Sequence, residues 1–291
     1  MSFLDRFKSQ PRWKHTDAAV RAAAVAEMPD DTEHQAVITD LASSDEDVRV
    51  RRAALLRLTD VAVLASRARA ESDPDLRRTL ADRLVGVAIA QSETDAAAAL
   101  ALSGLDDPRQ FATVAKSSPH DTIRAAALGR VHDPKALSSI ARHALDGQTA
   151  LDAVARLSDG PELLNVALKT DHKEAGIAAL EKSLSDAAMD DASRRETLET
   201  AAAKARNKSV TKRARALLGA IQDAEAARRM ALEQWQHRVA SVVARVEAIA
   251  ANPSIAHAGR ELAEAEADWR EVAASGTFEL DPDTAGRFGA L

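Results

Sequence analysis

The densest cluster of positive side chains lies in the stretch AKARNKSVTKRARA, which carries no acidic residue. Clustered Lys and Arg bind phosphate groups because they displace counterions from a nucleic acid. The stretch lacks aromatic side chains, which would add stacking on bases. It is the candidate segment for binding a nucleic acid or another partner, and a solvated helix face is the alternative interpretation. Its cations are Lys204, Arg206, Lys208, Lys212, Arg213 and Arg215.

A second group of cations occupies one position of a recurring phrase, written VRAAAVAEM, VRRAALLRL, LRRTLADRL and IRAAALGRV. Arginine binds carboxylates or phosphates through paired hydrogen bonds, so a row of arginines could line a binding groove. Alternatively, each arginine binds an Asp or a helix C-terminal carbonyl of a neighbouring repeat, and Asp47, Asp75 and Asp121 stand close in the sequence. We favour the second, structural role. These ladder arginines are Arg21, Arg51, Arg77 and Arg124.

The residue patterns that support catalysis are missing from the sequence. There is no Cys, which excludes disulfides, thiol nucleophiles and Cys-ligated metal sites. The eight His residues include no pair at i, i+4 spacing, and neither a Gly-rich phosphate loop nor a G-x-S-x-G motif occurs. We therefore predict a protein that is not an enzyme and that needs no metal or cofactor.

The recurring phrase indicates which elements position these side chains. Strong copies begin at residues 20, 50, 76 and 123, and weaker copies begin at residues 97, 149, 175 and 210. Each copy reads as a helix; in the copy at 123, one face carries Ile123, Ala126, Ala127 and Val131. A turn and a second helix follow, and the second helix after residue 84 (VGVAIAQ) is unusually short. This self-similarity predicts an all-α solenoid in which neighbouring helix pairs bury each other's apolar faces.

The composition supports closely stacked helices. Hydrophobic residues make up 46% of the 291 residues, but aromatic residues make up only 3%. Much of the apolar content is Ala, which has a high helix propensity and is too small to fill a broad core. The first residues lack the apolar stretch of a signal peptide, and no segment approaches the roughly 18 apolar residues of a membrane span. We expect a cytoplasmic protein, and its net charge of −6 argues against nucleic-acid binding outside a local basic patch.

The repeat pattern breaks near Gln222. Residues 223–252 read as one long helix and residues 254–276 as a second, and a third helix is expected from Asp281. We interpret Trp235 and Trp269 as anchors of helix packing. Three regions follow: a cap segment at 1–13, a repeat solenoid at 14–222, and a long-helix hairpin or incomplete three-helix unit at 223–291. The expected apolar faces of the two long helices also include Met230, Val239, Val242, Val246, Ile249, Leu262, Ala265 and Val272.

The N-terminal segment FLDRFKSQPRWK combines Phe3, Leu4 and Phe7 with several basic residues. A short basic amphipathic helix could dock on a membrane surface or on a partner. A solenoid, however, needs a cover over the open end of its first repeat, and these aromatic residues would provide it. We favour the cap.

The pattern D-x-x-V-R-x-x-A-A-x-x-L resembles HEAT repeats of the short bacterial type over residues 14–222. This resemblance implies a right-handed α-solenoid. The C-terminal part resembles an uncharacterised bacterial helical domain that often follows a HEAT array and a start like M-S-F-L-D-R-F. Further helical units usually follow in that family, so we expect this chain to be the first part of a longer protein. The matching residues are Leu262, Trp269, Asp281, Pro282, Arg287 and Phe288.

Three functional hypotheses follow. The leading one is a non-catalytic scaffold that binds a protein or ribonucleoprotein partner on the solenoid surface. The second is a nucleic-acid-binding protein that uses the run from Lys204 to Arg215. The third is a HEAT-like DNA glycosylase or lyase, which the sequence disfavours because Phe111 is the only aromatic residue inside the array.

Overall fold

The computed structural model describes residues 10–251, 255–274, 278 and 286. These residues form fifteen α-helices and one short 3-10 helix, and the chain divides into two compact units, Met1–Arg215 and Ala216–Leu291. None of the described helices combines the length and the apolar character that crossing a membrane requires. The short helices are η2 (Arg12–Lys14), α1 (Ala18–Glu27), α2 (Thr32–Ser44), α3 (Val48–Arg57), α4 (Val61–Ala70), α5 (Pro74–Ile89), α6 (Asp95–Ser103), α7 (Pro108–Ser117), α8 (Asp121–Gly129), α9 (Pro134–His143), α10 (Gly147–Arg156), α11 (Gly160–Lys169), α12 (Lys173–Leu184) and α13 (Asp191–Lys204).

Aspartate caps fix where most of these helices begin. In ten of the described helices, an Asp precedes the first turn and its carboxylate accepts a hydrogen bond from a backbone N–H of that turn. Such a cap stabilises a helix by about 1 kcal/mol. A Pro stands at the first or second position of α5, α7, α9 and α11, where its missing N–H costs no helical hydrogen bond. Because isolated helices of about ten residues are unstable in water, packing must supply the remaining stability.

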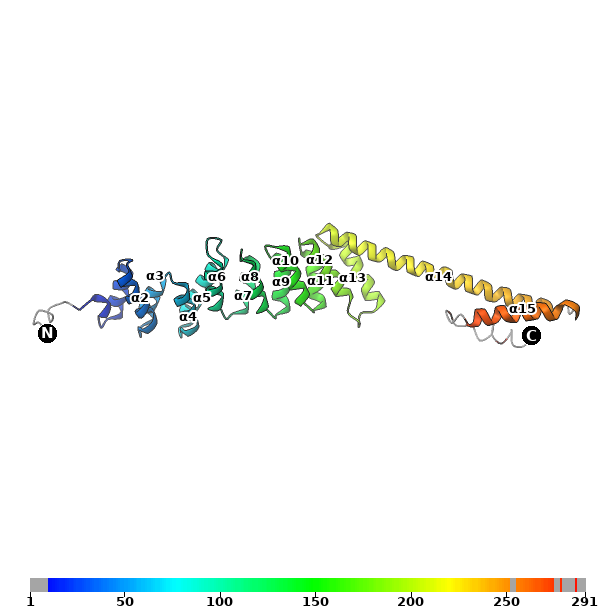
Figure 1. Cartoon of the computed structure of the whole chain (residues 1–291), viewed down its shortest axis with the longest axis horizontal. Helices are drawn as coiled ribbons and strands as arrows, with labels where there is room; N and C mark the ends of the chain where they lie inside the picture. The colour runs from blue at the N-terminus through cyan, green and yellow to red at the C-terminus, as the bar shows by residue number, and fades with distance from the viewer. Residues whose placement is uncertain (1–9, 252–254, 275–277, 279–285, 287–291) are drawn as a thin grey trace, which may run out of the picture. The chain divides into compact units, whose positions relative to one another are not determined.

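The helices of the first unit pack in sequential pairs. α7 packs on α8, α9 on α10 and α11 on α12, and helices two places apart, such as α8 and α10, also pack together. Figure 1 shows these helices following one another in chain order. Of the expected stripe, Ile123, Ala127 and Val131 are buried, whereas Ala126 is exposed. The first unit is thus an all-helical assembly of short helices that is consistent with a helical repeat.

The short second helix expected after residue 84 does not exist as a separate element. The segment VGVAI continues α5, which runs unbroken to Ile89 because no capping residue or Pro interrupts it. Helix α6 packs on both α5 and α4. A Cβ at Gly104 would lie only 2.7 Å from the Cα of Ala65 and from Cδ1 of Leu84. Glycine therefore permits the close approach of α6 to α4.

The long helix expected from residue 223 begins earlier in the structure. Helix α14 (Lys208–Ala251) begins inside the basic stretch and continues for 44 residues. Between residues 216 and 234 the sequence has no Pro, and its single Gly219 costs a helix only about 1 kcal/mol. The last weak copy of the repeat phrase and the long helix are therefore one element.

The second unit is a helical hairpin formed by the C-terminal part of α14 and α15 (Ile255–Ala274), which Figure 1 shows in yellow to red. Trp235 and Val239 pack against Val272, and the Trp235 indole N–H donates a 3.3 Å hydrogen bond to the Val272 carbonyl. Trp269 is only half-buried against this core. Both tryptophans therefore take part in helix packing.

Two residues of the expected apolar faces are exposed instead: Met230 by 59% and Leu262 by 38%. Met230 lies five residues before Trp235, which packs against Val272 near the end of α15. The third helix expected from Asp281, with the matching residues Pro282, Arg287 and Phe288, falls outside the described residues.

At the N-terminus, the half-buried Trp13 in η2 lies edge-on to His34, with the ring centres 6.1 Å apart. Arg12 forms a 2.7 Å ion pair with Glu27 at the end of α1. Phe3, Leu4 and Phe7, on which the cap hypothesis depends, lie outside the described residues.

Candidate functional site

The ladder arginines are directed at the chain's own backbone. Nη1 of Arg21 donates to the carbonyls of residues 15 and 16, Nη1 of Arg51 to those of 45 and 46, and Nη1 of Arg124 to those of 118 and 119. Arg77 donates through Nε and Nη2 to the carbonyl of Glu71. Each arginine thus binds the turn five or six residues before it, at the end of the preceding helix.

Three of these arginines also reach a carboxylate in the following turn. Arg21 binds Asp45 through two 2.8 Å hydrogen bonds. Arg51 binds Glu71 at 3.0 and 2.7 Å. Arg124 lies 2.8 Å from Asp146. Each of these arginines connects two successive turns, which favours the structural role.

The Arg51–Glu71 pair is the most deeply buried of these contacts. The Glu71 side chain is 1% exposed and that of Arg51 is 12% exposed. The carboxylate of Glu71 also accepts hydrogen bonds from the backbone N–H groups of Ser72 and Asp73. The hydrogen bonds from Arg51 lower the pKa of Glu71 to about 2, and this effect exceeds the opposing effect of burial. The Glu71 carboxyl is therefore ionised at neutral pH.

The acids that stood close in the sequence have different roles. Asp47 binds Arg49 rather than Arg51. Asp75 lies in the first turn of α5. Asp121 does lie 2.5 Å from Arg124. Sequence proximity thus found one of the five carboxylates with which the ladder arginines form ion pairs, namely Asp45, Glu46, Glu71, Asp121 and Asp146.

A second set of cations, which the sequence reasoning missed, joins successive repeats through helix C-terminal carbonyls. Arg57 donates to the carbonyl of Met28 at 2.8 Å, Arg156 to that of Val131 at 3.0 Å, and Lys182 to that of residue 155 at 2.6 Å. The last carbonyls of a helix have no partner within it and carry partial negative charge, so cations are favourable there. The set is Arg57, Arg83, Arg130, Arg156 and Lys182.

The sequence did contain a signal for this second set. Each member is the eighth residue of a copy of the recurring phrase, six positions after the ladder position. In the copy at 97, the eighth residue is Gly104, where the close approach to α4 leaves no room for a side chain.

The structure places the predicted basic run at the junction between α13 and α14. All six of its cations are exposed. Arg206 forms a 2.9 Å ion pair with Asp171, and Arg213 forms a 2.7 Å pair with Glu181. These two acids come from an earlier part of the chain, so the run is less isolated than its sequence indicated. The cations without an ion-pair partner among the described residues are Lys204, Lys208, Lys212 and Arg215.

The basic run continues a row of cations that crosses several repeats. The turns after α7, α9 and α11 are hydrogen-bonded in sequence: the N–H of Leu145 donates to the carbonyl of residue 116 at 2.9 Å, and the N–H of Arg206 to that of residue 168 at 2.9 Å. Between them, the hydroxyl of Thr170 donates to the carbonyl of residue 141 at 3.0 Å. The last turns of four helices therefore lie side by side, and each carries a Lys or Arg. We call these cations the basic edge: Lys116, Arg142, Lys169 and Lys204.

The pKa of His143 is lowered in part by the positive charge of this edge. Burial lowers the pKa of His143, and the charges of Arg142, Lys116 and Arg206 lower it further, against the opposing charge of Asp171. The same helices begin at the opposite edge, where capping aspartates stand beside the carbonyl-binding cations. Adjacent helices joined by such short turns are antiparallel, so each edge holds both kinds of helix end and the helix dipoles largely cancel. Side-chain charge therefore determines the sign of the basic edge.

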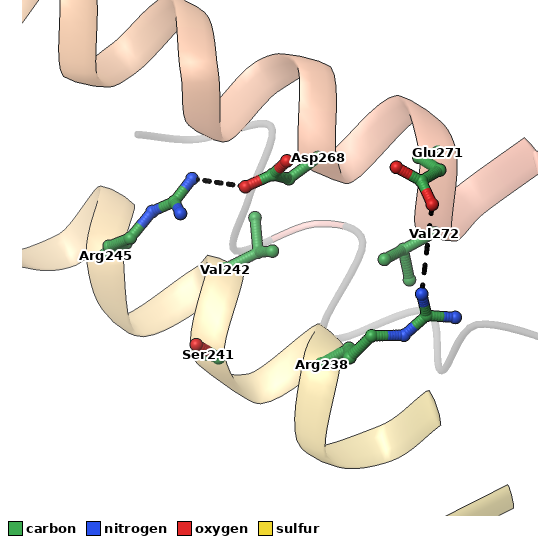
Figure 2. Close-up of a pocket in the computed structure, with 7 residues that line it drawn as sticks. All are labelled: Arg238, Ser241, Val242, Arg245, Asp268, Glu271 and Val272. Atoms are coloured by element: carbon green, nitrogen blue, oxygen red, sulfur yellow. Dashed lines mark hydrogen bonds and ion pairs between the residues drawn. The ribbon is translucent and has the colours of Figure 1, made fainter. Parts of the chain in front are cut away.

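The second unit contains a hollow of about 260 Å³ between α14 and α15. Figure 2 shows Val242 and Val272 between the two helices, together with two ion pairs that connect α14 to α15. Arg245 lies 2.7 Å from Asp268, and Arg238 lies 3.9 Å from Glu271. Both cations are thus balanced by acids, and the only hydroxyl in the lining, Ser241, has no histidine beside it in this hollow. Within the described part of the chain, no group of three or more His, Asp or Glu side chains could hold a metal ion.

A scan against protein-family models and a search of the curated proteins found no match to this chain.

Proposed function

We propose that this protein is a non-catalytic interaction protein that docks a partner protein on an array of HEAT-type repeats. The observation that supports it most directly is the row of turns after α7, α9, α11 and α13, which are hydrogen-bonded side by side. Such a row repeats one kind of surface at regular intervals, as helical-repeat binding proteins do.

The proposal also includes the handedness of the solenoid and the type of its repeats. We infer a right-handed α-solenoid of HEAT type because the copies at residues 97, 123, 149 and 175 follow one another at 26-residue intervals and because the helices pack in sequential pairs. The carbonyl-binding cations and the ladder arginines support this inference, since both sets join neighbouring repeats at equivalent positions.

Nucleic-acid binding through the basic run is the second candidate. It is favoured by one observation: four of the six cations have no ion-pair partner among the described residues. Such binding would weaken steeply with added salt and would be lost in a Lys208→Gln/Lys212→Gln variant.

A capture experiment tests the proposal. The purified chain is immobilised and exposed to a lysate of the source cells, with and without nuclease, beside an unrelated helical protein of similar size and charge. We expect a small set of proteins to remain bound to this chain alone after nuclease treatment. Complete loss of retention on nuclease treatment would replace protein docking with the nucleic-acid candidate.

A further inference from the structure

The basic edge carries an exposed aliphatic side chain at its centre. Leu145, in the turn between α9 and α10, is 68% exposed, more than any other large hydrophobic residue of the described chain. Its backbone N–H is held by the carbonyl of Lys116, and the neighbouring carbonyl of residue 144 accepts a hydrogen bond from His172. The position of Leu145 is therefore fixed by the repeats on both sides, and its exposure is not that of a loose loop.

The positive charge around Leu145 is in excess. The acids in these turns each lie against a cation. Asp121 and Asp146 share Arg124 at 2.5 and 2.8 Å, Asp171 lies 2.9 Å from Arg206, and Glu174 lies 3.7 Å from Lys173. In contrast, Lys116 and Lys169 have no ion-pair partner within the described chain. A ligand that approaches Leu145 thus meets cations on either side and few free carboxylates.

The spacing of these cations sets the size of a ligand. Packed helices lie about 8–10 Å apart, so the three intervals from α7 to α13 span roughly 30 Å. An extended peptide covers at most about 3.5 Å per residue, so about nine residues would pass along the whole edge.

These observations favour a protein ligand over a nucleic acid. A phosphate backbone gains little from an aliphatic side chain, and the edge has no Phe, Trp or Tyr on which a base could stack. We propose that the basic edge and Leu145 together bind an extended acidic segment of a partner protein, and that this segment places one large apolar side chain against Leu145. This inference rests on the proposed function and identifies its binding surface.

The test uses a library of random dodecapeptides displayed on phage and selected on the full chain at about 150 mM salt, where exposed charges are screened beyond about 8 Å. Selected sequences are synthesised with a fluorescein label, and their binding is measured by fluorescence anisotropy. We expect them to share several acidic residues and one large apolar residue. We expect Kd to rise at least tenfold in the Lys116→Gln/Lys169→Gln variant and about tenfold in Leu145→Ser.

Two matched variants serve as controls. Arg109→Gln removes one charge at the other end of α7, and Leu56→Ser removes a side chain that is 61% exposed on α3. Both should leave Kd within twofold of the wild type. Circular dichroism of every variant confirms that the helices are intact.

Three outcomes would overturn the inference. Selected peptides could lack acidic residues, or their binding could be unaffected by the basic-edge variants, or a labelled oligo-dT of twenty nucleotides could bind more tightly than the peptides and respond to the same variants. In the first two cases, proteins captured after nuclease treatment would still support the proposed function, with another surface as the docking site. A chain that captures no protein at all would refute the proposed function itself.

Discussion

Replacing Glu71 with Gln tests whether buried ion pairs hold the repeats together. The Glu71 side chain is 1% exposed and accepts four hydrogen bonds, two of them from Arg51. Its pKa falls from the usual 4.5 to about 2 in the folded protein. By linkage, this difference corresponds to about 3 kcal/mol of folding free energy at neutral pH.

The sign of the pH dependence follows from the same values. Because the pKa of Glu71 is lower in the folded state than in the unfolded state, the stabilisation is fully present above about pH 5. It is lost as the pH falls from 4.5 towards 2. We expect the Glu71→Gln variant to be less stable at pH 7 by about 3 kcal/mol and to lose less stability than the wild type on acidification.

Urea unfolding followed by far-UV circular dichroism at several pH values measures both effects. Arg49→Met is the matched control, because Arg49 also pairs with an acid, Asp47, but at the surface. Its unfolding midpoint should stay close to that of the wild type. An unchanged midpoint for Glu71→Gln at pH 7, or an acid sensitivity equal to that of the wild type, would refute the reasoning.

Three further predictions concern the contacts between helices. Arg57→Met removes hydrogen bonds to three carbonyls at the end of the first repeat and should cost about 1–2 kcal/mol in urea unfolding; a cost near zero would contradict their role. Gly104→Ala places a Cβ 2.7 Å from the backbone Cα of Ala65 and should lower the free energy of unfolding by about 1–3 kcal/mol. Gly86→Ala is the control, because its Cβ would meet nothing within 4 Å and should cost no stability. Equal urea midpoints for the two variants would show that α6 and α4 do not approach so closely. Trp235→Ala should destabilise the hairpin of α14 and α15 by about 3–5 kcal/mol. Limited proteolysis should then cleave faster within residues 216–274, while residues 10–215 stay protected. Unchanged proteolysis would mean that Trp235 does not anchor the hairpin.

The sequence predicted the helical pairs because Asp caps and apolar periodicity act locally. The predicted ends of two helices were wrong, because at those positions the sequence has neither a capping residue nor a Pro that would end a helix. VGVAIAQ was predicted to be a separate short helix because a second helix follows each copy of the recurring phrase, yet without a cap the first helix simply continued. The same reasoning explains why α14 passes through Gln222.

Site partners were harder to predict than helices because they come from distant turns. Arg51 binds Glu71, twenty residues later, rather than Asp47, four residues earlier. The partners of Arg206 and Arg213 lie 35 and 32 residues earlier in the chain. By contrast, the carbonyl-binding cations could have been found from the sequence, since Arg57, Arg83 and Arg130 all fall six residues after a ladder arginine.

The most direct measurement of partner docking is the capture of source-cell proteins after nuclease treatment by three immobilised chains: the wild type, Lys116→Gln/Lys169→Gln and the Arg109→Gln control. We predict that the same specific proteins remain on the wild type and on the control and are lost from the double variant. Retention that disappears from all three chains with nuclease, or that is equal on all three, would contradict docking on the basic edge.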